Sequence, residues 1–245
     1  MAVIGLQGLR GGVGTTSITA ALAWSLQQLG ETVLVIDASP DNLLRMFYNI
    51  DFAEPQGWAR AMLDNQDWRK SAWRYTRHLD VLPFGQLSPA EHETFETVEK
   101  ALGQFSHFLA DLKASQQYQW ILLDLPHGFK SLTRQLLAQT DSVLTVVKPD
   151  TNCHIRLHQQ ALPQGAHLLV NYLLVASQLQ DDIYQIWLQS QQAMIPIILH
   201  RDEAMAESAA VKQPLGEYRP DSLIAEEIMT LANWCLLNLS GKKHE

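Results

Sequence analysis

The chain has 245 residues, two cysteines, a hydrophobic fraction of 47% and a formal net charge of −8. This length suits one large α/β domain over residues 1–245, and the charge argues against non-specific binding to nucleic acid, which needs a basic surface. Two cysteines are too few for a disulfide framework, the first residues lack a secretory signal, and no stretch approaches the roughly 18 apolar residues that span a membrane, so we expect a cytoplasmic protein.

Hydrophobic patterns alternate between strand-like and helix-like segments along the whole chain, without an internal repeat. This alternation predicts an α/β fold, a doubly wound and mainly parallel sheet with helices on both faces. Strands are expected at residues 2–7, 32–36, 81–83, 120–124, 142–147, 167–171 and 195–199. Helices are expected at residues 16–29, 91–113, 153–161, 182–191 and 221–239, whereas residues 38–78 are predicted to form short helices and loops.

A glycine-rich loop lies between the first predicted strand and the first predicted helix, in the stretch from Gly8 to Ser17. Glycines let successive backbone N–H groups point into one concavity, and the helix that follows adds the partial positive charge of its N-terminus. This arrangement predicts a site for a triphosphate, with the Thr16 hydroxyl on Mg²⁺. The common motif G-x-x-x-x-G-K-[ST] is not met literally, because Leu9 stands at its first glycine and Thr15 at its lysine.

The stretch from Gln7 to Ser17 resembles the deviant Walker A loop of the MinD/ParA family of P-loop ATPases, whose pattern is Lys-Gly-Gly-x-Gly-Lys-[Ser/Thr]-[Ser/Thr]. Arg10 stands at the leading lysine of that pattern, and Thr15 stands at the second. Further matches follow in the family's order along nearly the whole chain. They are Asp37-Ala-Ser-Pro40 at the switch after the second strand, Ile121 to Pro126 at the Walker B strand, Val170-Asn171, and the segment from Ile195 through Arg201-Asp202 to Pro214.

The resemblance implies a site for ATP and Mg²⁺ between two facing protomers. The residues implied to contact the nucleotide are Leu9, Arg10, Gly11, Gly12, Val13, Gly14, Thr15, Thr16, Ser17, Asp37, Asp124, Asn171, Arg201 and Asp202. Those implied to hold the Mg²⁺ are Thr16, Asp37 and Asp124. Asn171 falls where the family's adenine-contacting Asn closes a strand, and Arg10 stands where the family's lysine reaches the phosphates of the other protomer.

Two departures from the family pattern weaken the implied hydrolysis. Thr15 replaces an ammonium group with a neutral hydroxyl, and one preorganised donor of that kind is worth roughly 2.7–4 kcal/mol in a transition state. Ser39 stands where the family has the Asp that orients the attacking water, and loss of such a group commonly costs about 10² to 10⁴ in rate. Asp41 is a candidate catalytic substitute. We predict tight ATP binding with slow or absent hydrolysis in an ATP-bridged homodimer; the alternative is an active ATPase that positions or assembles a membrane complex.

Within the family, four segments are most similar to a group of accessory proteins of bacterial cellulose biosynthesis. They are residues 10–16, 56–63, 152–163 and 180–184. This closer resemblance implies a regulatory role beside a membrane-embedded cellulose synthase complex, with the small partner BcsR and the regulator BcsE. It also implies indirect membrane contact, through recruitment to the inner membrane by the synthase complex.

Two other interpretations of chemically active residues stay open at this point. The pattern Gly12-x-Gly14-x-x-Ser17 with Asp37 is close to the fingerprint of a dinucleotide-dependent oxidoreductase, although the loop is longer than the tight turn of that fold. The pattern Cys153-His154-x-x-x-His158 has the i, i+4 spacing of metal ligands. No second pair of ligands is evident, so a helix surface is the favoured interpretation of these histidines.

The densest group of basic residues lies within residues 60–77 and is interleaved with aromatic ones. It consists of Arg60, Arg69, Lys70, Arg74 and Arg77, with Trp68, Trp73 and Tyr75. We interpret it as a solvated helix face with its aromatic side chains packed inward; a surface for a partner or nucleic acid is the alternative. The last predicted helix, residues 221–239, is expected to pack onto the sheet, because its polar face lacks the basic residues of a membrane-gripping helix.

Overall fold

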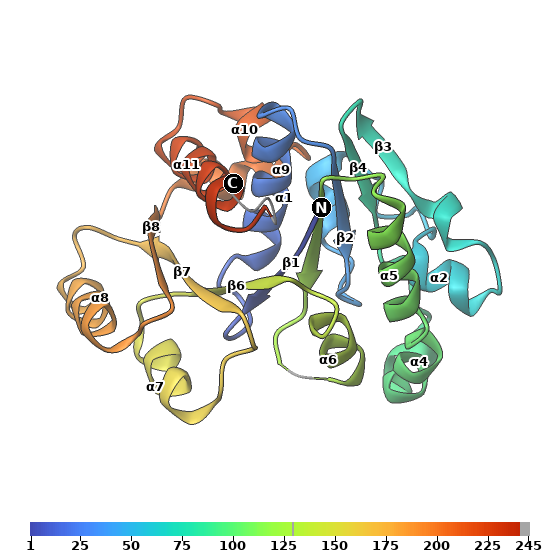
Figure 1. The fold of residues 1–245 in the computed structure, drawn as a ribbon, viewed down its shortest axis with the longest axis horizontal. Coiled ribbons are helices and arrows are strands. Elements are labelled where there is room, and N and C mark those ends of the chain that lie inside the picture. The colour runs from blue at the N-terminus through green and yellow to red at the C-terminus, as the bar shows by residue number, and fades with distance from the viewer. Residues whose placement is uncertain (129, 241–245) are drawn as a thin grey trace.

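The computed structural model describes residues 1–128 and 130–240. Within these residues the strands form one eight-stranded sheet in the order β3-β4-β2-β5-β1-β6-β7-β8 (Figure 1). Neighbouring strands run parallel except β3, which pairs with β4 in the antiparallel direction. The strands are β1 (Ala2–Gly8), β2 (Val33–Asp37), β3 (Trp73–Thr76), β4 (Leu79–Leu82), β5 (Trp120–Leu125), β6 (Ser142–Val147), β7 (Ala166–Leu173) and β8 (Met194–His200). The predicted doubly wound, mainly parallel sheet is confirmed.

Helices connect the strands and cover both faces of the sheet (Figure 1). The α-helices are α1 (Thr15–Gln28), α2 (Trp58–Leu63), α3 (Pro89–Glu93), α4 (Phe95–Leu102), α5 (Phe105–Ser115), α6 (Ser131–Leu137), α7 (Thr151–Gln159), α8 (Gln178–Ser190), α9 (Glu203–Ala210), α10 (Leu215–Tyr218) and α11 (Leu223–Asn238). Short 3₁₀ helices, η1 (Leu44–Tyr48) and η2 (Trp68–Ser71), lie in the segment after β2. One apolar core joins the sheet to α1, α7, α8 and α11, and a second joins it to α2, α4, α5 and α6.

The two cores explain why the central strands are apolar along most of their length. β1, β2 and β5 are buried at every residue, because helices cover both of their sides. Ile4 and Leu6 of β1 belong to the core on the α1 side, whereas Val3 belongs to the other core. Parallel strands end at one edge of the sheet, so the residues that follow β1, β2, β5 and β7 meet there. That edge carries the candidate site.

The last helix, α11, packs on α1 and β8, as the sequence predicted. Its buried residues are Ile224, Ala225, Ile228, Leu231, Ala232 and Cys235. Glu227 of α11 accepts the backbone N–H of His200 at 2.8 Å and so fastens the helix to the end of β8. Across residues 1–128 and 130–240, none of the helices has both the length and the apolar character that crossing a bilayer requires.

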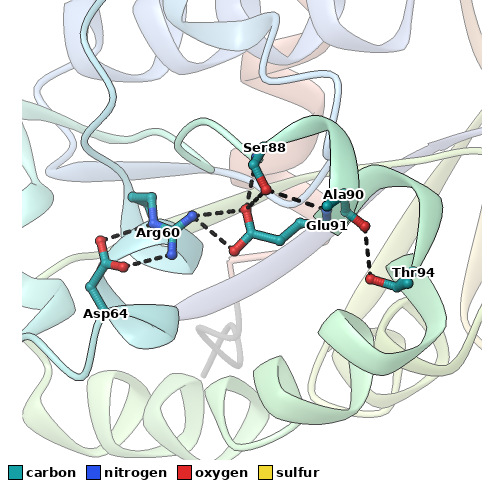
Figure 2. Close-up of polar contacts among 6 residues, drawn as sticks. All are labelled: Arg60, Asp64, Ser88, Ala90, Glu91 and Thr94. Carbon is teal, nitrogen blue, oxygen red and sulfur yellow. Dashed lines mark hydrogen bonds and ion pairs between the residues drawn. The ribbon is translucent and has the colours of Figure 1, made fainter.

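The single helix predicted after β4 is wrong, because the structure has three helices there, α3, α4 and α5. A capping box starts α3: the Ser88 hydroxyl accepts the N–H of Glu91 at 3.3 Å, and Glu91 accepts the N–H of Ser88 at 2.7 Å (Figure 2). The Thr94 hydroxyl donates to the carbonyl oxygen of Ala90 at 2.9 Å at the end of α3, and a glycine separates α4 from α5. Periodicity missed the second break because α4 and α5 bury their apolar residues in the same core.

Residues 38–78 contain short helices and loops, as predicted, but also β3, which the sequence analysis missed. β3 carries a weak pattern, because Trp73 and Arg74 are both exposed while Tyr75 and Thr76 are half-buried. The helices α6, α9 and α10 were not predicted either. They are seven, eight and four residues long, which is too short for a clear helical period.

Candidate functional site

The loop between β1 and α1 depends on glycine at three positions. Gly12 and Gly14 have φ values of 74° and 87°, in the left-handed region that favours glycine. At Gly8 the reason is steric, since a Cβ there would lie 2.6 Å from the carbonyl oxygen of Arg10 and 2.8 Å from Thr15 Oγ1. The loop therefore folds tightly back over the end of β1.

The first turn of α1 has no side-chain acceptor for its backbone N–H groups. Gly14 is the N-cap residue and offers no side-chain hydrogen bond, and no acidic residue lies in the first turn. The first four N–H groups of a helix lack partners within the helix, and the helix dipole adds partial positive charge at the same place. The loop and the helix start thus have the chemistry of an anion site.

β7 supports this loop through Asn171, which is 5% exposed. The Asn171 Nδ2 atom donates a hydrogen bond to the carbonyl oxygen of Val13 at 2.8 Å. A Cβ on Gly14 would lie 2.6 Å from that nitrogen and 3.2 Å from a ring carbon of Tyr172. Asn171, which the resemblance places near the adenine, thus also holds the loop through its amide N–H, and Tyr172 is the neighbouring aromatic side chain.

Gly14→Ala is expected to destabilise the fold by about 2–3 kcal/mol. The alanine would have to adopt the left-handed backbone conformation of this position, and its Cβ would clash with Asn171. Gly30→Ala is the matched control, since Gly30 has a φ of 88° but no atom within 4 Å of its Cβ position. The control should lose only about 1 kcal/mol, the cost of a left-handed conformation for alanine. Urea unfolding of both variants measures the difference, and equal losses would show that the contact with Asn171 is not tight.

Asp124 and Asp37 lie side by side at the ends of β5 and β2, where they are register partners. Asp124 is 2% exposed, and the Thr19 hydroxyl lies 3.5 Å from its Oδ1 atom. Burial raises the pKa of Asp124 to about 7, although hydrogen bonds from Thr16 and Thr19 act to lower it. The Oδ2 atom has no hydrogen-bond partner in the described part of the chain. Such a buried, unpartnered carboxylate oxygen is a place where a bound cation would be stabilised.

Asp37 is fully buried, and its carboxylate closes the loop that follows β2. Its Oδ1 atom accepts the N–H of Ser39 at 2.9 Å, and its Oδ2 atom accepts the N–H of Leu44 at 3.0 Å. Burial and the neighbouring charge of Asp124 raise the pKa of Asp37 well above its usual range. Asp41 is exposed in the same loop, and its N–H donates to Ser39 Oγ at 3.3 Å. Three acidic side chains therefore gather beside a glycine loop that contains no lysine.

Arg10 lies in the glycine loop and is held by its own chain. Its Nη2 atom donates to Asp150 Oδ2 at 2.5 Å, and its Nη1 atom donates to the carbonyl oxygen of Gly11 at 2.8 Å. Asp150 is also the N-cap residue of α7, because its Oδ1 atom accepts the N–H of Cys153 at 2.9 Å. The charge of Arg10 is thus fixed beside the loop by a carboxylate that α7 positions.

A cavity of about 330 Å³ opens beyond the ends of β6, β7 and β8, and Tyr172 connects it to the glycine loop. Lys148, Arg201 and Asp202 also line it. Asp202 caps α9 by accepting a backbone N–H at 2.9 Å, and the Lys148 ammonium lies 5.8 Å from the centroid of the Tyr172 ring. The structure therefore brings Arg201 and Asp202 together at one polar and aromatic cavity.

Sequence reasoning missed several side chains that surround these residues. They are Thr19, His127, Lys148, Asp150 and Tyr172. The His127 ring would lie 3.5 Å from a Cβ on Gly11. Thr19 lies one helical turn after the loop, and that spacing is a usable signal for a side chain that faces Asp124. Lys148 follows β6 and Tyr172 lies near the end of β7, and the neighbours of these strands are known only from the structure.

The alternative of a metal site on α7 is not supported. Cys153 is buried, and burial raises the pKa of its thiol, which disfavours the thiolate that a metal requires. His154 Nδ1 accepts the indole N–H of Trp187 at 3.1 Å, so the neutral ring carries its proton on Nε2 and offers no free nitrogen to a metal. Residues 1–128 and 130–240 contain no group of three or more His, Cys, Asp or Glu side chains that could hold a metal ion, on α7 or elsewhere.

The strand order also argues against the dinucleotide alternative. In the dinucleotide fold the second strand lies directly beside the first and carries the acid that binds ribose. Here β5 lies between β1 and β2, and Leu6 of β1 pairs with Asp124. The strand that carries Asp124 therefore separates Asp37 from the glycine loop, and the oxidoreductase interpretation fails on this geometry.

A glycine loop between β1 and α1, with a buried carboxylate at the end of the neighbouring strand, defines a P-loop protein of the MinD/ParA fold. The fold is shared with the septum site-determining protein MinD of Pyrococcus horikoshii OT3, complexed with Mg-ADP; the TM-score is 0.77, the identity is 18%, and 99% of each chain is covered. It is shared with a ParA family ATPase from Chlorobium tepidum TLS, at a TM-score of 0.74 and 22% identity, over 95% of this chain and 98% of that one.

Sequence comparison narrows this class to one family. The family model for cellulose biosynthesis protein BcsQ matches residues 1–236. The cellulose biosynthesis protein BcsQ of Escherichia coli (strain K12) is 64% identical over 243 residues, which cover 99% of this chain and 97% of that protein. The chain therefore belongs to the BcsQ family of cellulose biosynthesis proteins, which confirms the resemblance found in its sequence segments.

Proposed function

We propose that this protein is an ATP-binding accessory and regulatory protein of the bacterial cellulose synthesis and secretion machinery. It binds ATP with Mg²⁺, pairs two copies across the nucleotides, and hydrolyses ATP slowly or not at all. The observation that carries the proposal is the unpartnered Oδ2 atom of Asp124 next to an uncapped helix start, because the two together favour a cation beside an anion. The proposal treats residues 1–245 as one nucleotide-binding domain.

The residues of the site fit a Mg-nucleotide. Backbone N–H groups of residues 10–17 would hold the phosphates, whereas the N–H of Leu9 already donates to the carbonyl oxygen of Val146 at 3.0 Å. Thr16, Asp37 and Asp124 would hold the Mg²⁺, with the Asp124 carboxylate at its water shell. The cavity lined by Arg201 and Asp202 would take the nucleoside. The bound ion would supply the positive charge that a loop without lysine lacks.

The side chains around the phosphate end support slow hydrolysis. Thr15 offers a hydroxyl where an ammonium would stabilise developing charge. The Ser39 hydroxyl already accepts the N–H of Asp41, and a hydroxyl is a far weaker general base than a carboxylate. Asp41 is exposed, so water screens its charge.

The contact between Arg10 and Asp150 supports a dimer that depends on nucleotide. Arg10 bridges to a second protomer only after it leaves Asp150, and both side chains are partly exposed, at 23% and 26%. A guanidinium can donate two parallel hydrogen bonds to a phosphate, as it does to a carboxylate, and the phosphate carries at least as much negative charge. ATP in a facing protomer would therefore compensate for the bond that Arg10 gives up.

Asp150→Asn is expected to lower the ATP concentration needed for half-maximal dimerisation by about threefold to tenfold, because Asn caps α7 well but holds Arg10 less strongly. Asp67→Asn is the matched control, since Asp67 is also an N-cap and pairs with Arg69 at 3.4 Å, in η2. Light scattering at a series of ATP concentrations measures the midpoint. An unchanged midpoint in Asp150→Asn would show that the bond to Arg10 does not limit dimerisation.

Membership of the BcsQ family supports the proposed link to cellulose synthesis. The partners in this proposal are the cellulose synthase complex, the small protein BcsR and the regulator BcsE, which the resemblance of the sequence implies. In this proposal the synthase complex recruits the protein to the cytoplasmic side of the inner membrane. The packing of α11 on α1 and β8 agrees with contact through partners, because the apolar face of that helix is already buried. An active MinD/ParA-type ATPase that positions a membrane complex would use the same site and differ in turnover.

Three measurements on the purified full-length protein test the proposal. Chromatography of the nucleotide released by denaturation should identify an adenine nucleotide, and recovery of a nicotinamide dinucleotide would overturn the proposal. Phosphate release in a malachite-green assay should be far slower than for ordinary MinD/ParA proteins, and an ordinary rate would establish the active-ATPase alternative. Light scattering with and without Mg-ATP, alone and with BcsR, should show a dimer that requires the nucleotide.

A further inference from the structure

We propose that the edge of the sheet at β3 is a docking site for an extended acidic segment of a partner protein. We call this surface the basic edge; it consists of Arg69, Lys70, Trp73, Arg74 and Arg77 with the cavity that adjoins them. The residues do not form the helix face predicted from the sequence, because they lie on η2, on β3 and just beyond it. Arg60 is not part of the surface, since it pairs with Asp64 and Glu91 between α2 and α3 (Figure 2).

The cavity of the basic edge has a volume of about 490 Å³ and lies between β4, η2 and the end of α5. Trp68 and Leu82 form an apolar part of the cavity wall, and the cationic side chains of Arg69 and Arg74 also line the cavity. It also contacts Tyr118, just before β5, so it lies toward the amino ends of the parallel strands, opposite to the glycine loop. The cavity therefore is separate from the proposed nucleotide site and has room for a large side chain.

The charge of the basic edge is opposite to that of the whole chain, whose net charge is −8. Arg69 pairs with Asp67 at 3.4 Å and Arg74 with Asp80 at 2.9 Å, but the Arg74 side chain is still 69% exposed. Lys70 and Arg77 are exposed and have no ion pair among the described residues. Carboxylates of a partner would thus find cations that the chain itself does not neutralise.

β3 also offers main-chain recognition, because it is the terminal strand of the described sheet and pairs only with β4. An extended segment can add to such an edge through backbone hydrogen bonds. Trp73 in this strand is 42% exposed, and exposed Trp and Arg side chains are the types that dominate binding energy at interfaces. The buried Nε1 atom of Trp68, at the cavity wall, has no hydrogen-bond partner among the described residues.

A protein segment fits this surface better than a nucleic acid does. A nucleic acid is a long polyanion and would meet the net negative charge around the basic edge, whereas a short acidic segment meets only the local cations. Asp80 and Asp111 at the cavity would repel phosphates but not an apolar side chain. We therefore assign the cavity to one aromatic or large aliphatic residue of the segment and Lys70 and Arg77 to its carboxylates.

A random peptide library displayed on phage and selected on the full-length protein tests this assignment. Selected peptides should be acidic with one aromatic or large aliphatic residue. Their affinity, measured by fluorescence anisotropy on the free peptides, should fall about tenfold or more in Lys70→Glu/Arg77→Glu, because each exposed contact changes from attraction to repulsion. Trp73→Ala should also weaken binding.

Lys100→Glu/Arg134→Glu is the control, since it makes the same charge change at exposed positions on α4 and α6. The control should bind the peptides as the parent protein does, and circular dichroism should show all variants folded. ATP binding should be unchanged in every variant, which separates this test from that of the nucleotide site. Absence of selected peptides, peptides that bind the charge-reversed variant equally well, or tighter binding of a single-stranded oligonucleotide would each overturn the proposal.

Discussion

Thr15→Lys should raise ATP turnover by about 10²-fold or more. The Thr15 Oγ1 atom lies 2.8 Å from the Cβ position of Gly8, so the side chain already turns toward the inside of the loop. A lysine there would bring an ammonium to the phosphates, and one preorganised donor of this kind contributes about 10² to 10³ in rate. Phosphate release at saturating Mg-ATP measures the gain.

Ser39→Asp in the same background should add a further gain of about 10² or more, because it restores a carboxylate that can orient water. Asp37 holds the N–H of residue 39 at 2.9 Å, so the new side chain would start from a fixed backbone position. Thr15→Met is the matched control, since methionine has comparable length and no charge, and it should not raise turnover. If Thr15→Lys binds ATP and turns it over no faster than the parent, the missing ammonium is not the cause of slow hydrolysis.

Local sequence patterns predicted most of the fold because its central strands are buried on both sides. Such strands are continuous apolar runs, as in residues 33–36 and 120–123, and helices between them bury regular stripes. The antiparallel β3 and the breaks between α3, α4 and α5 could not be predicted in that way. Trp73 and Arg74 are adjacent and both exposed. The breaks depend on Thr94, whose hydroxyl bond changes no hydrophobic spacing, and on Gly103 between α4 and α5.

Some residues of the candidate site could be predicted from local sequence patterns, whereas others are brought together only by long-range contacts. The glycine loop and the acids that end β2 and β5 could be placed from the sequence, because each lies directly after a predicted strand. The strand order could not, and it is this order that makes Asp37 and Asp124 neighbours. The bond from Arg10 to Asp150 joins residues 140 positions apart, and that from Asn171 to Val13 joins residues 158 apart. No periodicity encodes contacts of this kind.

Asp124→Asn should make the nucleotide-free protein more stable at neutral pH. Burial raises the pKa of Asp124 from 3.8 to about 7, so the folded state binds this proton more tightly than the unfolded chain does. The resulting stabilisation is complete below the unfolded pKa and is lost as the pH rises through the folded pKa. Each pKa unit corresponds to about 1.4 kcal/mol, so the parent should lose a few kcal/mol between about pH 4 and pH 8 through this group.

Urea unfolding as a function of pH, without nucleotide or Mg²⁺, measures this loss. The Asn variant should show a smaller fall in the free energy of unfolding over the same range, and only the part due to the burial of Asp37 should remain. Asp111→Asn, at an exposed acid on α5, is the control and should follow the parent curve. Parallel curves for the parent and Asp124→Asn would show that Asp124 is not held protonated by burial.

The same substitution should weaken Mg-ATP binding by about 10²-fold or more, because a neutral amide replaces the carboxylate with the unpartnered oxygen. Calorimetric titration with ATP in Mg²⁺ and in EDTA measures the effect. In Asp124→Asn the ATP affinities under these two conditions should differ much less than they do in the parent protein. The buried Asp124 carboxylate destabilises the protein when no ion is bound, and its contacts within the described residues do not compensate for this. Binding of the ion is therefore the property that accounts for an acid at this position. A variant that gained stability but kept its Mg²⁺-dependent affinity would mean that another group holds the ion.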